Sequence, residues 1–435
     1  MILDPVDITR VLLAGPWRPS LMELRLAHEA GWLRPSADMT RLVADIVERW
    51  PQPPDPAALM ALLAERREVA TPRTHPEPPP PPPPPRVRRR RLVGIDPPLR
   101  NTDELLRLLW LEEAELRWFA DLQQRNSRTG EQRLRHYRYR VVADPSHPRL
   151  LEIPKVRLKE IQRRIASSVL SSLPLHPAAH GAVADRSVGT ALRPHAEQAV
   201  VVRCDLESFF ASITADRVAG ELGLIGLDRV LAATVAGLCT AAVPLTVRRG
   251  LPRPADPDRL AAHWRWSHRL SSAHLPQGSP SSPRLANAIA YGLDRRLTAL
   301  AERLGAAYTR YVDDLTFSGP DSLAVGPLLA GVREIVRSEG FAVNEAKTRV
   351  LRTHQRQRVL GAVVNDRPRL DRRERDRLRA IVHNCLASGP SSQAGERGVA
   401  HLRGELAGRI GWAGQLDEAD GRKLRAGFDQ IDWSR

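Results

Sequence analysis

The architecture of this chain follows from one stretch, Tyr308-Thr309-Arg310-Tyr311-Val312-Asp313-Asp314-Leu315-Thr316-Phe317-Ser318-Gly319. Two adjacent aspartates lie between two runs of β-prone residues, 308–311 and 315–317. This pattern predicts a β-hairpin with the acidic pair at its tip. Because like charges repel, a folded protein keeps such a pair beside cations or in water. A turn without chemistry has a similar composition, so the pair alone does not decide the function.

A third acidic residue ends an apolar run farther upstream. Val200-Val201-Val202-Arg203-Cys204-Asp205 is typical of a strand buried on both faces. Next to the hairpin, Asp205 would bring a third carboxylate to Asp313 and Asp314. Three such groups can hold two Mg²⁺ ions about 3.5–4 Å apart, which activate a 3′-hydroxyl and stabilise a leaving pyrophosphate. Mg²⁺ suits this arrangement because it takes few carboxylates and leaves positions for phosphate oxygens.

The composition of the chain favours a polyanionic partner. Its 435 residues include 66 Lys and Arg against 50 Asp and Glu, a net charge of +16, which indicates nucleic acid. An arginine-rich protein from a GC-rich genome would share this bias. The scattered cysteines Cys204, Cys239 and Cys385 predict neither a disulfide framework nor a zinc site. Without a long apolar run or a signal-peptide pattern, we expect a cytoplasmic protein with no membrane contact.

The first part of the chain reads as a separate unit. Apolar periodicity predicts a small helical N-terminal segment over residues 1–70, with helices at 8–13, 21–30, 39–50 and 56–68. We assign it no activity. Residues 71–92 are a Pro/Arg-rich linker that would adopt polyproline II. The arginines that follow its prolines are either a solvated cluster or ligands for nucleic-acid phosphates; they include Arg88, Arg89 and Arg90.

Three motifs in chain order carry a resemblance to a known family. Tyr311-Val312-Asp313-Asp314 looks like the Tyr-x-Asp-Asp motif of reverse transcriptases, and residues 205–210 resemble their first palm motif. Between them, Leu275-Pro276-Gln277-Gly278-Ser279-Pro280-Ser281-Ser282-Pro283 is similar to the Pro-Gln-Gly-x-x-x-Ser-Pro motif of the bacterial enzymes. Residues 153–165, 180–188, 341–350, 357–365 and 401–412 extend the resemblance, which covers about residues 101–435 and is strongest for retron-type enzymes.

The resemblance implies an α+β, right-hand polymerase fold. We expect fingers and N-terminal helices over 93–204, a palm with an antiparallel sheet over 205–366, and a helical thumb over 367–435. The fingers would include a strand pair at 136–142 and 150–154 and a helix at 112–125, and a helix at 285–304 would pack beneath the palm sheet. Residues 248–274 read as an irregular insertion whose histidines 263, 268 and 274 lie exposed in a loop.

The resemblance also implies roles for single residues. Asp205, Asp313 and Asp314 would bind two Mg²⁺ ions, with Mn²⁺ as an alternative, and Lys347 would protonate the pyrophosphate. Phe210 would be the aromatic gate against a ribose 2′-hydroxyl. The full set of expected nucleotide-binding residues is Phe210, Gln277, Gly278, Arg186, Lys155 and Tyr311. The expected nucleic-acid-binding residues are Arg157, Arg163, His195, Arg88, Arg89 and Arg90.

The function implied is an RNA-directed DNA polymerase that copies a structured non-coding RNA, with RNA-linked DNA and a role in phage defence. Its partners would be RNA template and primer, DNA product, deoxynucleoside triphosphates and an effector protein. The sequence departs from retrons at Val312, at Val359-Leu360-Gly361 and around Ala191 to His195. Two alternatives therefore stay open: another bacterial defence reverse transcriptase without branched priming, and a catalytically idle RNA-binding scaffold. A group II intron enzyme and an RNA-dependent RNA polymerase are less favoured.

Overall fold

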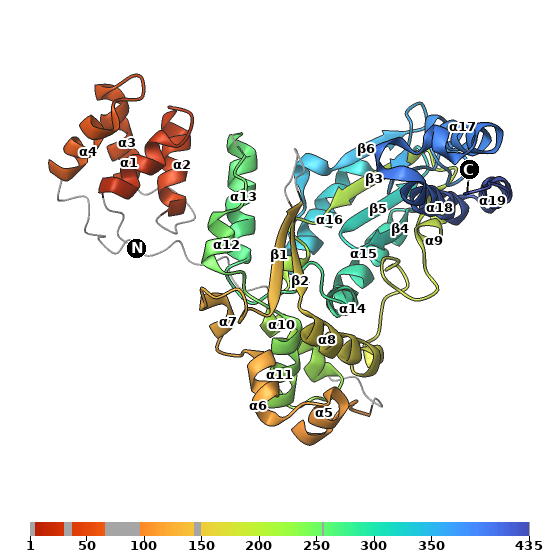
Figure 1. Cartoon of the computed structure of the whole chain (residues 1–435), viewed down its shortest axis with the longest axis horizontal. Coiled ribbons are helices and arrows are strands. Elements are labelled where there is room, and N and C mark those ends of the chain that lie inside the picture. Colours follow the sequence, from red (N-terminus) through yellow and green to blue (C-terminus); the bar gives the residue numbers. More distant parts are fainter. Residues whose placement is uncertain (1–4, 30–36, 66–95, 143–148, 255, 435) are drawn as a thin grey trace.

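The computed structural model describes residues 5–29, 37–65, 96–142, 149–254 and 256–434 (Figure 1). Within these ranges no helix combines the length and the apolar character needed to cross a membrane. The arginines predicted at positions 88–90 lie outside the described residues, so their role stays a prediction. The same holds for the linker over 71–92.

The four helices predicted at the N-terminus form a small bundle with its own core. They are α1 (Pro5–Leu13), α2 (Pro19–Glu29), α3 (Ala37–Arg49) and α4 (Pro56–Glu65). Leu12, Met22 and Ile46 are completely or almost completely buried between them. The bundle lies apart from most of the chain, next to α13 (Pro257–Arg269) (Figure 1). Leu21 of α2 packs there against Leu260 and Trp264.

The fingers contain the expected strand pair, but one predicted helix is shorter. Strands β1 (Tyr137–Val142) and β2 (Arg149–Pro154) pair antiparallel. The helix expected at 112–125 ends at Ala120, because Asp121 adopts a left-handed conformation with φ of 41°. The other elements of this part are α5 (Thr102–Leu109), α6 (Glu113–Ala120), α7 (Arg125–Arg128), α8 (Val156–Ser168), η2 (Leu170–Ser172), α9 (Val188–Leu192) and η3 (Arg193–His195).

The palm is an antiparallel sheet with the order β4-β5-β3-β6. Its strands are β3 (Val200–Asp205), β4 (Ala307–Tyr311), β5 (Asp314–Gly319) and β6 (Arg349–Arg352). As the apolar run predicted, β3 is buried on both faces. Val200 and Val202 belong to the large core beneath the sheet, and Val201 belongs to the core that the thumb helices close. The central strand therefore joins palm and thumb.

Helices cover the sheet and continue into the thumb. The helix predicted at 285–304 is two helices that meet at Ala290, where ψ is 0°. The helices of the palm are η4 (Phe210–Ser212), α10 (Ala215–Leu224), α11 (Arg229–Cys239), α14 (Ser282–Ile289), α15 (Tyr291–Arg303), α16 (Val325–Ser338) and η5 (Glu345–Lys347). A hairpin and the thumb follow, with β7 (Arg358–Val359), β8 (Ala362–Val363), α17 (Arg372–Ser388), η6 (Pro390–Gln393), η7 (Gly395–Arg397), α18 (Gly398–Leu416) and α19 (Glu418–Asp429).

The insertion at 248–274 is more ordered than predicted. Most of it is α12 (Leu245–Arg249) and α13, whose start is capped by Asp256 and carries Pro257 at the first position. The histidines expected to lie exposed in a loop are divided: His268 is exposed, whereas His263 and His274 are buried. His274 lies 3.1 Å from the Glu152 carboxylate, and this contact holds the insertion against the fingers.

The structure corrects one predicted nucleic-acid contact. His195 has no exposed surface, since η3 brings its ring against the face of the palm sheet that carries Val201 and that the thumb core covers. Its Nδ1 lies 2.7 Å from the Ser318 hydroxyl and its Nε2 lies 2.8 Å from the Thr309 hydroxyl. Burial lowers the pKa of His195 to about 3. The residue therefore fastens η3 to β4 and β5 in its neutral form.

This burial predicts a pH-dependent stability. Below the usual histidine pKa of about 6.5, His195 binds a proton in the unfolded chain but stays neutral in the folded protein. As the pH falls, the contribution of His195 to the free energy of unfolding therefore decreases by up to ~1.4 kcal/mol per pH unit. We expect His195→Gln to destabilise the protein most above pH 7, and the deficit to shrink toward pH 5. Urea unfolding at several pH values measures it. His268→Gln, at an exposed position, is the control. A deficit independent of pH would contradict the prediction.

Candidate active site

The three predicted carboxylates meet at the edge of the palm sheet. Asp205 ends β3 and Asp314 begins β5, and the two are directly opposite in the antiparallel register. Asp313 precedes Asp314 in the hairpin turn, and its carbonyl accepts a hydrogen bond of 2.9 Å from the Leu206 backbone. Strand pairing between segments about one hundred residues apart thus assembles the acidic group that the sequence predicted.

Two basic side chains face this acidic group. The Lys347 ammonium lies 3.1 and 3.2 Å from the two oxygens of Asp205, and the Arg203 guanidinium lies 3.4 Å from Asp314. Burial, followed by the charges of Asp205 and Asp314, raises the pKa of Asp313 to about 6. Burial also raises the pKa of Asp314. Two cations therefore do not balance three carboxylates here.

Seven of the ten predicted catalytic and nucleotide-binding residues line one cleft of about 460 Å³ around these carboxylates. Fingers residues such as Glu152 form one side, and the thumb residue Trp412 forms part of the other. The predicted residues in the lining are Asp205, Phe210, Gln277, Tyr311, Asp313, Asp314 and Lys347. Seven residues spread over more than 140 positions of the sequence are thus brought to one place.

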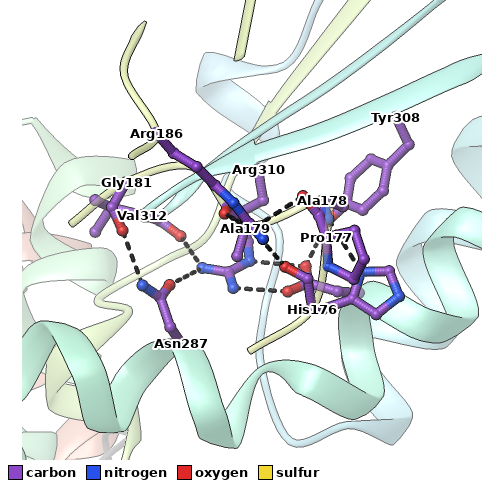
Figure 2. Close-up of polar contacts among 11 residues, drawn as sticks. His176, Pro177, Ala178, Ala179, Gly181, Arg186, Asn287, Tyr308, Arg310 and Val312 are labelled. Carbon is purple, nitrogen blue, oxygen red and sulfur yellow. Dashed lines mark hydrogen bonds and ion pairs between the residues drawn. The ribbon is translucent and has the colours of Figure 1, made fainter. Parts of the chain in front are cut away.

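Three predicted nucleotide-binding residues do not line this cleft. Gly278 has φ of +135°, and a Cβ there would lie 2.9 Å from the Glu152 carbonyl oxygen, so the position requires glycine. The Lys155 ammonium donates to two backbone carbonyls at 2.8 Å each. Arg186 donates from Nη1 to the carbonyls of residues 176, 177 and 179 (Figure 2). Contact of these three with a nucleotide stays a prediction.

A buried arginine behind the acidic pair was not predicted. Arg310 on β4 has no exposed surface, and its Nε and Nη2 donate to the Asp294 carboxylate at 2.8 and 2.7 Å. Its Nη1 donates to Asn287 Oδ1 and to the Val312 carbonyl oxygen, both at 2.9 Å (Figure 2). One guanidinium thus ties α14 and α15 to the turn that carries the two aspartates. A charged residue inside a run of β-prone residues was the signal in the sequence.

The turn that Arg310 supports is conformationally costly. Val312 has φ of 59°, which is a rare conformation for a β-branched residue. Gly181 makes room beside it, because a Cβ there would lie 2.6 Å from Val312 Cγ2 and 2.8 Å from the Val312 nitrogen. Asn287 completes the support by donating to the Gly181 carbonyl at 2.8 Å. Such strain persists only where the surroundings over-determine it.

The insertion helix α13 also contributes to the site. Arg265 makes two hydrogen bonds of 3.1 Å to the Glu207 carboxylate, and Arg269 donates to the Glu207 carbonyl at 3.0 Å. Glu207 lies two residues after Asp205, and Trp266 from the same helix lines the cleft. Sequence reasoning assigned no function to this insertion, since its contacts bridge about 60 positions.

Comparison with known proteins decides the family. The family model for reverse transcriptase (RNA-dependent DNA polymerase) matches residues 142–364, which include all three carboxylates. The chain belongs to the reverse transcriptase family. This confirms the resemblance that its motifs indicated, and the mixed helical and antiparallel structure agrees with the right-hand polymerase fold.

Curated relatives are retron reverse transcriptases. Retron Mx65 reverse transcriptase of Myxococcus xanthus is 42% identical over 277 residues, which are 63% of this chain and 61% of that protein. Retron Mx162 reverse transcriptase of the same organism is 36% identical over 77% of this chain and 67% of that protein. Retron Ec86 reverse transcriptase of Escherichia coli is 28% identical over 64% of this chain and 76% of that protein. The match thus spans about three fifths to two thirds of the first two relatives.

The Arg310 contacts generate a prediction about catalytic geometry. Arg310→Met leaves Asp294 buried without its partner, which should cost about 3–5 kcal/mol of stability. Adding Asp294→Leu removes the stranded charge and should restore much of that stability. Neither variant can donate to the Val312 carbonyl. We therefore expect nucleotide addition per active site to stay about 100-fold slow in the stable double variant, since small misplacements cost that much.

Urea unfolding and single-turnover nucleotide addition, normalised to the burst amplitude, measure the two effects separately. Arg337→Met is a matched control, because Arg337 is exposed and its ion pair is with Glu334 of the same helix. A double variant that regains both stability and the wild-type rate would show that the Arg310 pair serves folding alone.

Proposed function

We propose that the chain is a retron-type RNA-directed DNA polymerase, which extends a primer on an RNA template by two-metal nucleotidyl transfer. The observation that carries this proposal is the meeting of Asp205, Asp313 and Asp314 with Lys347 in one cleft between fingers and thumb. Phosphoryl transfer needs mainly positioning and neutralisation of negative charge, and this cleft provides groups for both.

The chemistry of the acidic group fits Mg²⁺, with Mn²⁺ as an alternative. The donors are carboxylate oxygens, and the three carboxylates outnumber the two basic side chains beside them. In the described residues, no group of three His, Cys, Asp or Glu side chains is arranged to hold a metal ion. At the acidic group, Lys347 pairs with Asp205 and Arg203 pairs with Asp314. Asp205, Asp313 and Asp314 would hold the ions, which when bound activate the 3′-hydroxyl and offset phosphate charge.

The other cleft residues have separate tasks in this proposal. Lys347, whose side chain is 44% exposed, holds a proton at Nζ that it can give to the leaving pyrophosphate. Phe210 presents an aromatic ring to the cleft and would exclude a ribose 2′-hydroxyl, which selects deoxynucleotides. Gln277 contacts the incoming base pair, and its carbonyl is fixed by a hydrogen bond of 2.9 Å from the Glu152 backbone. Tyr311 lies beside the primer end.

The retron assignment rests on the relatives. The relatives are named as retron reverse transcriptases. With this assignment we propose a structured non-coding RNA as template and primer, an RNA-linked DNA product, an effector protein partner, a role in phage defence and a location in the cytoplasm. Extraction of nucleic acid from the protein purified with its flanking RNA tests this. DNA that is joined to RNA through a debranching-sensitive linkage supports the retron reading, whereas unbranched DNA points to another defence reverse transcriptase.

Loss of the acidic pair should abolish polymerisation but not RNA binding. Asp313→Asn with Asp314→Asn removes two metal ligands while keeping side-chain size, so we expect a loss of at least about 1000-fold in deoxynucleotide incorporation. The measurement is primer extension on an RNA template with Mg²⁺, beside a binding assay with the same RNA. Asp321→Asn is the control, since Asp321 is 83% exposed and pairs with Arg352. A wild-type protein that binds RNA but incorporates nothing would support the scaffold instead.

A further inference from the structure

An exposed tryptophan in the fingers breaks two local rules at once. Trp110 ends helix α5 in the left-handed conformation, with φ of 54° and ψ of 53°. Glycine is usual at such a helix end, because a Cβ makes this conformation unfavourable. The residue is also 72% exposed, although its indole is one of the largest apolar groups in proteins. Local rules are broken in this way mainly at functional positions.

The surroundings hold Trp110 rigidly in this costly position. Its backbone N–H bonds to the carbonyls of Leu106 and Arg107, and its own carbonyl accepts a hydrogen bond of 2.8 Å from Arg157. The Arg164 guanidinium lies over the ring, with Cζ 3.6 Å from the ring centroid. Arg164 is itself fixed, because it donates to the Leu109 carbonyl at 3.2 Å and to Glu160 at 3.2 Å.

This arrangement offers an aromatic plate with a cation behind it. One face of the indole rests on Arg164, and the large exposed fraction leaves the opposite face to solvent. Every nucleobase has a π face that can stack on such a plate, and stacking does not depend on the base. Arg157 and Arg163 are exposed on the same helix, α8, and can reach phosphates next to a stacked base. The carboxylate beside Arg163 is that of Glu160, which lies 3.9 Å away and also pairs with Arg164.

The position of Trp110 relative to the cleft indicates which nucleic-acid strand would stack on it. Helix α8 follows β2, whose Leu150 and Glu152 line the cleft. Arg164 lies roughly 12 Å farther along α8, at 1.5 Å per residue from Val156. In Figure 1, α5, α6 and α8 lie below the β1–β2 hairpin, whereas thumb helices α17–α19 lie at the upper right. A strand that leaves the cleft past β2 and continues along α8 therefore runs toward Trp110.

We propose that Trp110 is a stacking platform for a base of the unpaired RNA template ahead of the nucleotide cleft. Arg164 supports the ring from behind, and Arg157 and Arg163 contact the adjacent phosphates. This inference rests on the proposed polymerase function, because it concerns the same RNA. It adds a single-strand site on the fingers that is separate from the carboxylates and from the residues of the cleft.

The test compares two primer–template duplexes with the same paired region, one with a long unpaired 5′ template extension and one with a single unpaired template nucleotide. We expect the wild-type protein to bind the long template more tightly, and Trp110→Ala to lose about tenfold in affinity for that template only. Trp110→Phe should retain most of the gain. Trp118→Ala is the matched control, since Trp118 is 47% exposed but packs edge-on against His136.

Abasic substitutions along the extension locate the contact. The wild-type affinity should fall at one or two template positions, and Trp110→Ala should be insensitive at those positions. Equal affinity of wild type and Trp110→Ala for the long template would overturn the inference and leave Trp110 as a candidate protein contact. Weakening of both templates alike would overturn it too. Incorporation on the short template reports the polymerase function separately, so that failure of one proposal is distinguishable from failure of the other.

Discussion

The buried ion pair between Arg310 and Asp294 is the constraint on which the acidic hairpin depends. A charge in the interior is tolerated only when it is paired and its remaining hydrogen-bonding groups are satisfied. Here each of the three guanidinium nitrogens of Arg310 has a partner, from Asp294, Asn287 and the Val312 carbonyl. The hydroxyl of Tyr308 adds a further hydrogen bond to Asp294 at 2.9 Å. The interaction fixes α14 and α15 to β4, and the acidic pair lies at the turn that follows β4.

The negative charge of the three aspartates is only partly neutralised. Lys347 and Arg203 each reach one aspartate, while Asp313 has its pKa raised to about 6 by burial and by the two carboxylates beside it. Such a site stores electrostatic free energy that a divalent cation can release. The rigid ion pair behind the hairpin explains how the repulsion is tolerated, since the turn cannot relax by moving its aspartates apart.

The sequence predicted what short motifs and apolar patterns encode. It located the strand ending at Asp205, the acidic hairpin and the cleft residues, because strand pairing and burial follow from local composition. It failed where the outcome depends on distant contacts. His195 was assigned to nucleic acid, although Thr309 and Ser318 enclose it. The insertion was predicted to be irregular because contacts to Glu207 and to the N-terminal bundle stabilise its helix α13, and the local sequence does not reveal these contacts. Arg310 was passed over because its partners lie elsewhere in the chain.

The close approach of Gly181 to Val312 has a consequence for how this protein can diversify. The loop glycine and the second residue of the catalytic turn share one small volume, so a larger side chain at either position demands adjustment at the other. A smaller residue at position 312 would relax the demand on position 181, whereas any side chain at 181 would press on the turn itself. The two positions are therefore expected to covary among homologues, and mutational paths that change residue 181 first should be closed.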